Sequence, residues 1–190
     1  MLHLVYGGSG SGKSAYAESL VEKYASGPRY YLATMQVFGK EDEERIARHR
    51  RMRAQKQFTT IEKQTDIGEV ILDGNATVLL ECMSNLVANE MFRKEAPRGD
   101  EAAGLIADKI LADICRLQEQ VANLVIVTAN VFDDGVKYSK ETEAYQQALA
   151  ICNERLARMA DSVTEVVVGI PLTIRNPKGR CRHEENFKSM

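Results

Sequence analysis

Short apolar segments alternate along this chain with longer segments in which apolar residues recur at helical spacing. The short segments are almost continuous in aliphatic and β-branched residues, as is typical of strands that are covered on both faces of a sheet. They predict strands at Leu2–Tyr6, Arg29–Thr34, Thr77–Glu81, Leu124–Ala129 and Val163–Gly169. The longer segments predict helices at Lys13–Ala25, Glu41–Gln55, Met83–Lys94, Glu101–Val121 and Thr142–Ala160.

This alternation of strands and helices predicts an α/β fold. Parallel strands need a crossover connection, which is right-handed in nearly all proteins, and the crossover helices then cover the sheet. We therefore expect a mainly parallel sheet with helices on both faces. No repeat or linker divides the chain, so we expect a single domain over residues 1–175 and a polar C-terminal tail over residues 176–190.

The composition excludes several classes of function but identifies none. The 190 residues are 44% hydrophobic and 27% charged, and the net charge of −2 gives no general attraction to nucleic acid or to an anionic membrane. No apolar segment approaches the roughly 18 residues that cross a bilayer, and the N-terminus lacks the pattern of a signal peptide. The four cysteines are widely spaced, and we interpret them as reduced thiols. We expect a cytoplasmic protein with no nucleic-acid partner and no membrane span.

The sequence GGSGSGKS, residues 7–14, fits the phosphate-binding pattern G-x-x-x-x-G-K-[ST] between the first predicted strand and helix. Glycines let backbone N–H groups turn toward an anion, and the helix N-terminus adds the positive end of its dipole. Lys13 is expected to reach the β- and γ-phosphates, and Ser14 to hold Mg²⁺. A glycine-rich turn without a ligand is the alternative, and the complete motif in this context argues against it. The expected nucleotide contacts in the loop are Gly7, Gly8, Ser9, Gly10, Ser11, Gly12, Lys13 and Ser14.

Glu81 ends the predicted strand TVLLE, at the kind of position where α/β sheets meet their ligands. Its carboxylate could hold Mg²⁺ directly or through water, or accept hydrogen bonds from a nucleotide. A solvent-exposed strand end without a ligand is the alternative that stays open.

The segment RIARHRRMR, residues 45–53, places His49 among five arginines. Arg45, His49 and Arg53 share one helical face at spacing i, i+4, i+8. Neighbouring positive charges favour the neutral imidazole, arginines bind phosphate oxygens, and histidine can be a covalent nucleophile. The segment also fits a solvated, salt-bridged helix with acids first and bases later, and residue types alone favour that interpretation.

In combination, these motifs resemble the bifunctional adenosylcobinamide kinase/adenosylcobinamide-phosphate guanylyltransferase family of cobalamin biosynthesis. The resemblance covers Leu2 to about Leu172 and rests on the GGxxSGKS loop, on YLAT, on R-I-x-x-H-R-x-x-R followed by T-x-E, and on a closing GIPL. It implies a RecA-like P-loop fold and a homotrimer. It also implies GTP, with ATP as a further candidate phosphoryl donor, together with Mg²⁺ and a corrinoid substrate.

Members of that family phosphorylate the aminopropanol hydroxyl of adenosylcobinamide and then transfer GMP from GTP to this phosphate through a guanylylated histidine. The resemblance implies that His49 is this nucleophile. Together with the roles that the motif and the strand end gave, the expected catalytic residues are His49 and Lys13, and the expected metal ligands are Ser14 and Glu81. The guanine-nucleotide contacts outside the loop would be Thr34, Met35, Gln36, Arg50, Arg51, Met52, Arg53, Glu62 and Glu81.

One segment departs from the family pattern. The family has N-E-V-G after its fourth strand, where this chain has ANVFDDGV, residues 129–136. If that loop serves the corrinoid or the kinase step, the kinase half-reaction is the one affected. The alternatives are another small P-loop kinase and a non-catalytic GTP-binding regulator. The early position of the arginines favours nucleotidyl transfer over the first, and the intact His49, Arg45, Arg53 and Glu62 argue against the second.

Overall fold

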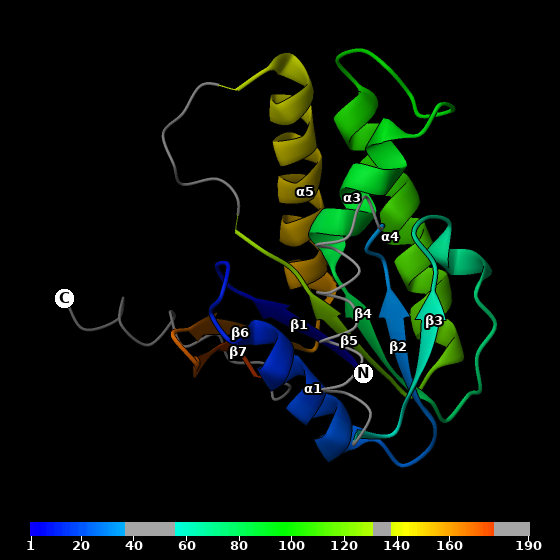
Figure 1. The fold of residues 1–190 in the computed structure, drawn as a ribbon, viewed down its shortest axis with the longest axis vertical. Helices are drawn as coiled ribbons and strands as arrows, with labels where there is room; N and C mark the ends of the chain where they lie inside the picture. Colours follow the sequence, from blue (N-terminus) through cyan, green and yellow to red (C-terminus); the bar gives the residue numbers. More distant parts are fainter. Residues whose placement is uncertain (37–55, 131–137, 177–190) are drawn as a thin grey trace.

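The computed structural model describes residues 1–36, 56–130 and 138–176, which form a seven-stranded sheet with helices packed against it (Figure 1). The strand order is β3-β2-β4-β5-β1-β6-β7, and every neighbouring pair is parallel except the antiparallel pair β6–β7. The strands are β1 (Leu2–Tyr6), β2 (Arg29–Ala33), β3 (Phe58–Glu62), β4 (Thr77–Glu81), β5 (Asn123–Val127), β6 (Ser162–Val167) and β7 (Ile170–Arg175). The helices are α1 (Lys13–Tyr24), the short 3₁₀ helix η2 (Ile67–Glu69), α3 (Met83–Phe92), α4 (Ala102–Gln120) and α5 (Lys140–Met159).

The expected mainly parallel sheet is confirmed, and the helices of the described residues lie on both of its faces. The predicted helix Glu41–Gln55 lies outside the described residues. No helix within the described ranges is long and apolar enough to cross a membrane.

Two edge strands were missed, and the last predicted strand was wrong in its extent. β3 has the sequence FTTIE, in which both threonines and the glutamate are exposed, so it carries no continuous apolar run. The predicted strand Val163–Gly169 ends at Val167 in the structure, because Val168 and Gly169 form a turn into β7. β7 escaped prediction because it lies at the sheet edge and is exposed along nearly its whole length.

The continuous apolar runs of the central strands are explained by a core on each side of the sheet. In β4, Leu79 faces α1, whereas Val78 and Leu80 face the layer formed by α3, α4 and α5. All three side chains are completely buried, and burial of each contributes roughly 1.5–3 kcal/mol to folding. Because successive side chains of a strand point to opposite faces, a strand covered on both sides has to be apolar at every position.

The parallel arrangement of the strands determines where the candidate site lies. Parallel strands bring their carboxyl ends to the same edge of the sheet, and the register pairs Glu81 of β4 with Ala33 of β2 and with Val127 of β5. β1 ends at this edge as well, since Val5 also pairs with Val127. The glycine-rich loop that follows β1 therefore lies near the end of β4.

Candidate functional site

The glycine-rich loop presents the start of α1 as an open helix N-terminus. Gly10 and Gly12 adopt φ values of 69° and 88°, which side chains other than glycine rarely allow. Gly12 immediately precedes α1, and within the described residues no side chain caps this helix end by a hydrogen bond. The N–H groups of the first turn therefore remain available to an anion, as in phosphate-binding loops.

Gly7 allows the loop to approach β6. A Cβ atom at Gly7 would lie 2.6 Å from the carbonyl oxygen of Val166 and 2.7 Å from Oγ of Ser11, which is too close for either contact. The first glycine of the motif is therefore required by packing rather than by an unusual φ value.

Lys13 folds back over the loop that it follows. Its ammonium group donates a hydrogen bond of 3.0 Å to the carbonyl oxygen of Gly8, and this interaction is exposed. The positive charge thus lies along the concave loop where phosphate oxygens would be bound.

Ser14 and Glu81 meet across the site. The Ser14 hydroxyl donates a hydrogen bond to Oε1 of Glu81, which links the first turn of α1 to the end of β4. A hydroxyl and a carboxylate are hard oxygen ligands of the type that Mg²⁺ prefers, and Mg²⁺ sites beside substrate phosphates commonly use only one or two protein ligands. The residues present therefore fit Mg²⁺, and the solvent-exposed strand end considered for Glu81 is not what the structure shows.

Thr34 links the ends of β2 and β4 by hydrogen bonds at this edge of the sheet. It is fully buried, and its hydroxyl donates to the carbonyl oxygen of Cys82 at 2.9 Å and accepts from the Cys82 N–H at 2.8 Å. The Asn89 side chain donates to the Thr34 carbonyl oxygen at 2.7 Å. These bonds link the ends of β2 and β4 to α3, and they occupy the hydroxyl of Thr34. Met35 and Gln36 follow at the same edge and are half-buried.

The remaining predicted contacts are more distant or lie outside the described residues. Glu62 is exposed at the end of β3, four strand positions from β1, which corresponds to roughly 19 Å at the usual strand spacing. His49 and residues 50–53 lie outside the described residues. The structure thus brings Lys13, Ser14 and Glu81 together and leaves Glu62 at the far end of the edge.

A family model described as cobinamide kinase / cobinamide phosphate guanyltransferase matches residues 3–174. The chain is 33% identical over 184 residues to the bifunctional adenosylcobalamin biosynthesis protein CobU of Escherichia coli (strain K12), an alignment that covers 92% of this chain and 100% of that protein. It is 32% identical over 185 residues to the protein of the same description from Salmonella typhimurium (strain LT2), with the same coverage. The chain belongs to the cobinamide kinase / cobinamide phosphate guanyltransferase family.

Membership in this family makes the chain a transferase of cobalamin biosynthesis, as the sequence resemblance implied. The solved structure of an ATPase domain is similar in fold, with a TM-score of 0.53 at 11% identity over 95% of this chain and 78% of that chain. At this identity the likeness shows the fold alone, and it confirms the expected RecA-like P-loop architecture.

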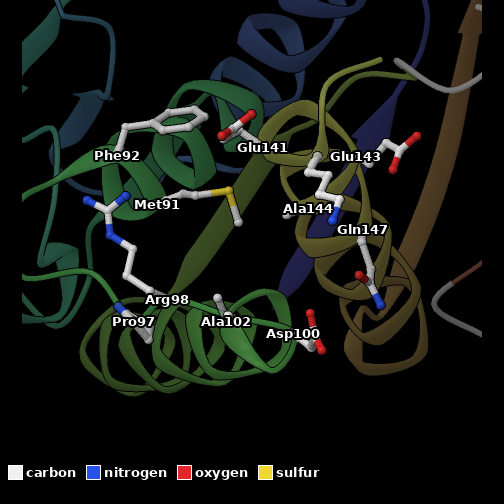
Figure 2. Close-up of a pocket in the computed structure, with 12 residues that line it drawn as sticks. Met91, Phe92, Pro97, Arg98, Asp100, Ala102, Glu141, Glu143, Ala144 and Gln147 are labelled. Carbon is white, nitrogen blue, oxygen red and sulfur yellow. The ribbon is translucent and has the colours of Figure 1, made fainter. Parts of the chain in front are cut away.

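A separate pocket of about 700 Å³ lies in the helical layer of this transferase (Figure 2). Its wall combines the end of α3, the segment that leads into α4, and the first turns of α5. The apolar lining residues are Met91, Phe92, Pro97, Ala102 and Ala144. The polar ones include Arg98, Asp100, Lys140, Glu141, Glu143 and Gln147. Its volume is within the range of pockets that bind small molecules.

A group of three carboxylates, which the sequence pattern did not reveal, is an ion-pair network. The carboxylates of Asp66, Glu90 and Asp113 lie within 4.8 Å of one another, but the Lys109 ammonium is 2.8, 2.6 and 3.0 Å from them, respectively. Burial alone would lower the pKa of Lys109, yet its hydrogen bonds to the three acids outweigh this and raise that pKa. The lysine lies where a cation would bind, so the group joins η2, α3 and α4 rather than forming a metal site.

Proposed function

We propose that the chain catalyses both reactions of its family. It phosphorylates adenosylcobinamide, and it transfers GMP from GTP to adenosylcobinamide phosphate to give adenosylcobinamide-GDP. The observation that carries the proposal is the contact between Ser14 and Glu81 beside the glycine-rich loop, in a chain that matches the family model over residues 3–174. It supports binding of a nucleoside triphosphate with Mg²⁺ at this edge of the sheet.

In the kinase reaction, the aminopropanol hydroxyl oxygen attacks the γ-phosphorus of ATP or GTP. The bond to the bridging oxygen breaks, the nucleoside diphosphate leaves, and the proton of the hydroxyl is released to solvent. The N–H groups of the loop and the Lys13 ammonium stabilise negative charge that develops on the phosphate oxygens. Ser14 and Glu81 would hold Mg²⁺, which neutralises part of the phosphate charge when bound.

In the guanylyl transfer, an imidazole nitrogen of His49 attacks the α-phosphorus of GTP, and pyrophosphate leaves. A phosphate oxygen of adenosylcobinamide phosphate then attacks the same phosphorus and breaks the phosphorus–nitrogen bond. The arginines of residues 50–53 would bind phosphate oxygens, with Met35, Gln36 and Glu62 as further nucleotide contacts. Thr34 would hold this edge of the sheet in place, since it is fully buried and its polar groups are bonded within the protein. The support for His49 is its match to the family segment together with the nucleotide site that the loop provides.

Labelled GTP tests this intermediate. The protein is incubated with Mg²⁺ and GTP carrying label on the α-phosphate, and label on the chain is expected to be acid-labile and alkali-stable. His49→Ala should abolish the label, whereas His183→Ala, which removes another of the three histidines, should retain it. Absence of label on the wild type, or equal label on His49→Ala, would contradict the guanylyl-histidine.

We place the body of the corrinoid in the pocket between α3, α4 and α5. The apolar wall with a charged rim suits a macrocycle that carries amide side chains. α3 begins beside Glu81, and Met91 is eight residues beyond Met83, or about 12 Å along the helix. The arm between the corrin ring and its hydroxyl has a comparable length, roughly 9 Å for about seven bonds, which supports reaction of the arm at the glycine-rich loop. Ala144→Trp should raise the KM for the corrinoid without reducing the label on the chain. An unchanged KM would remove the pocket from the proposal.

We further infer a homotrimer that acts in the cytoplasm, as the family resemblance implies. The cysteines of the described residues, Cys82, Cys115 and Cys152, are all free thiols, which suits a reducing compartment. Sedimentation equilibrium should give three times the chain mass of 21.2 kDa. A monomer mass at micromolar concentration would contradict the trimer.

A further inference from the structure

Asn89 of α3 joins the two chain segments that leave β2 and β3. Its side-chain amide donates one hydrogen bond of 2.7 Å to the carbonyl oxygen of Thr34 and a second of 3.0 Å to that of Gln64. Thr34 directly follows the last residue of β2, and Gln64 is the second residue beyond β3. The amide therefore supplies donors to two backbone carbonyl groups at the point where their strands have ended.

Helical preference does not account for asparagine at this position. Asn89 is the seventh residue of the ten-residue helix α3, where asparagine is a weaker helix former than alanine or leucine. The next residue, Glu90, accepts a hydrogen bond of 2.8 Å from the Asp66 N–H. The segment after β3 is thus bound by two consecutive residues of α3, and Asn89 is the one that also binds the segment after β2.

Both segments carry predicted nucleotide contacts. Met35 and Gln36 follow β2, and Glu62 is the last residue of β3. The phosphate contacts come from elsewhere, namely the glycine-rich loop after β1 and Glu81 at the end of β4. β2 and β3 are three and four strand positions from β1, which corresponds to roughly 14 and 19 Å. With the phosphates bound at the loop, the contacts after β2 and at the end of β3 are in a position to meet the nucleoside.

We propose that Asn89 is a positioning residue for the guanine nucleotide, because it fixes the spacing of the two segments so that their contacts meet the nucleoside together. This inference rests on the nucleotide site proposed above and adds a residue that acts through the contacts of that site. The end of β4 is held independently, since the Thr34 hydroxyl both donates to and accepts from the backbone of Cys82. The phosphate site at Glu81 is therefore expected to withstand the loss of Asn89.

The experiment measures kcat and KM for GTP in GMP transfer, together with the inhibition constant of Mg²⁺–tripolyphosphate, which has phosphates but no nucleoside. Asn89→Ala should raise the KM for GTP about five- to tenfold, the effect of roughly one net hydrogen bond, and leave the inhibition constant unchanged. The variant is expected to fold, since alanine favours the helix.

Asn123→Ala is the matched control. The Asn123 amide also donates two hydrogen bonds, of 3.3 Å to the carbonyl oxygen of Tyr24 and 3.2 Å to Oγ1 of Thr77. Asn123 and Thr77 are the first residues of β5 and β4, so this pair of bonds lies at the opposite edge of the sheet. The control loses an equal number of bonds and should keep the wild-type KM.

Hydrogen exchange in the free protein is the second readout. The Lys63 N–H donates a hydrogen bond of 3.0 Å to the carbonyl oxygen of Ala33, so this amide reports on the contact between the ends of β3 and β2. Asn89→Ala should speed its exchange, because the segment after β3 loses a bond that holds it. Asn123→Ala should leave the exchange at Lys63 unchanged.

Each result bears on a different claim. A wild-type KM for Asn89→Ala, or unchanged exchange at Lys63, would overturn the positioning role. An equal rise in the KM for GTP and in the inhibition constant would show that the phosphate site is disturbed, which also overturns it. A fall in kcat at unchanged KM in both variants would leave Asn89 with a purely structural role. If tripolyphosphate does not inhibit the wild type, the nucleotide site proposed above is wrong, and the inference falls with it.

Discussion

Replacement of Gly7 by alanine tests how closely the glycine-rich loop has to approach β6. The added Cβ would lie 2.6 Å from the Val166 carbonyl oxygen, whereas ordinary contacts begin near 3.4 Å. The loop would have to retreat by about 0.8 Å, and a shift of about 1 Å in reacting groups can reduce a rate by roughly 100-fold. This corresponds to about 2.7 kcal/mol in the activation free energy. The overpacked loop should also lower the free energy of unfolding by about 1–3 kcal/mol.

The assay is the initial rate of GMP transfer, combined with the Kd for Mg²⁺–GTP and with urea unfolding. Gly8→Ala is the matched control in the same loop, since a Cβ at Gly8 meets nothing within 4 Å. The control should keep its rate within a few-fold of the wild type. A wild-type rate for Gly7→Ala would refute the packing argument. An equal loss for Gly8→Ala would show that lost chain flexibility, rather than contact with β6, is responsible.

Further predictions concern the contact between Ser14 and Glu81, the ion-pair network around Lys109 and the thiol of Cys152. Ser14→Ala should raise the Mg²⁺ concentration for half-maximal activity about 10- to 100-fold in a metal titration. Lys109→Met leaves the buried Glu90 short of a partner and should lower the free energy of unfolding by about 3–5 kcal/mol in urea, with partial recovery on addition of Glu90→Gln. The hydrogen bond from Lys109 holds the pKa of Asp66 below its ordinary 3.8, so folding favours the charged carboxylate. The stability that Asp66 contributes is therefore complete above pH 3.8 and is lost as the pH falls through the lowered pKa. Asp66→Asn should weaken this pH dependence, which urea titrations at acidic pH would measure. Burial raises the pKa of Cys152 to about 12, so a thiol reagent should modify this residue only after unfolding, as mass spectrometry would show.

The central strands and the loop could be predicted from the sequence because their signals are local. A strand buried on both faces has to be apolar at every position, so LHLVY and TVLLE are recognisable without their neighbours. The loop is recognisable because phosphate binding requires its glycines, its lysine and its hydroxyl residue, and all of them fall within eight consecutive residues. The family segment around His49 is equally local, and it led to the family that the comparisons then showed.

The edge strands illustrate the opposite case. β3 and β7 are paired with the sheet but have little buried surface, so their sequences carry no strong apolar pattern. The pattern predicts Val168 as part of a strand because valine favours extended backbone, whereas the pairing of β6 with β7 reverses the chain there.

The sequence by itself determined the α/β class, the glycine-rich loop and the family, because each depends on residues that are close together in the chain. Only the tertiary structure decided that Ser14 meets Glu81, 67 residues away, and that Gly169 bonds to Ser11. Those contacts depend on strand order and register, which arise when distant segments pack together and which periodicity does not encode. For this reason the position of Glu81 beside the glycine-rich loop could be established only from the folded chain.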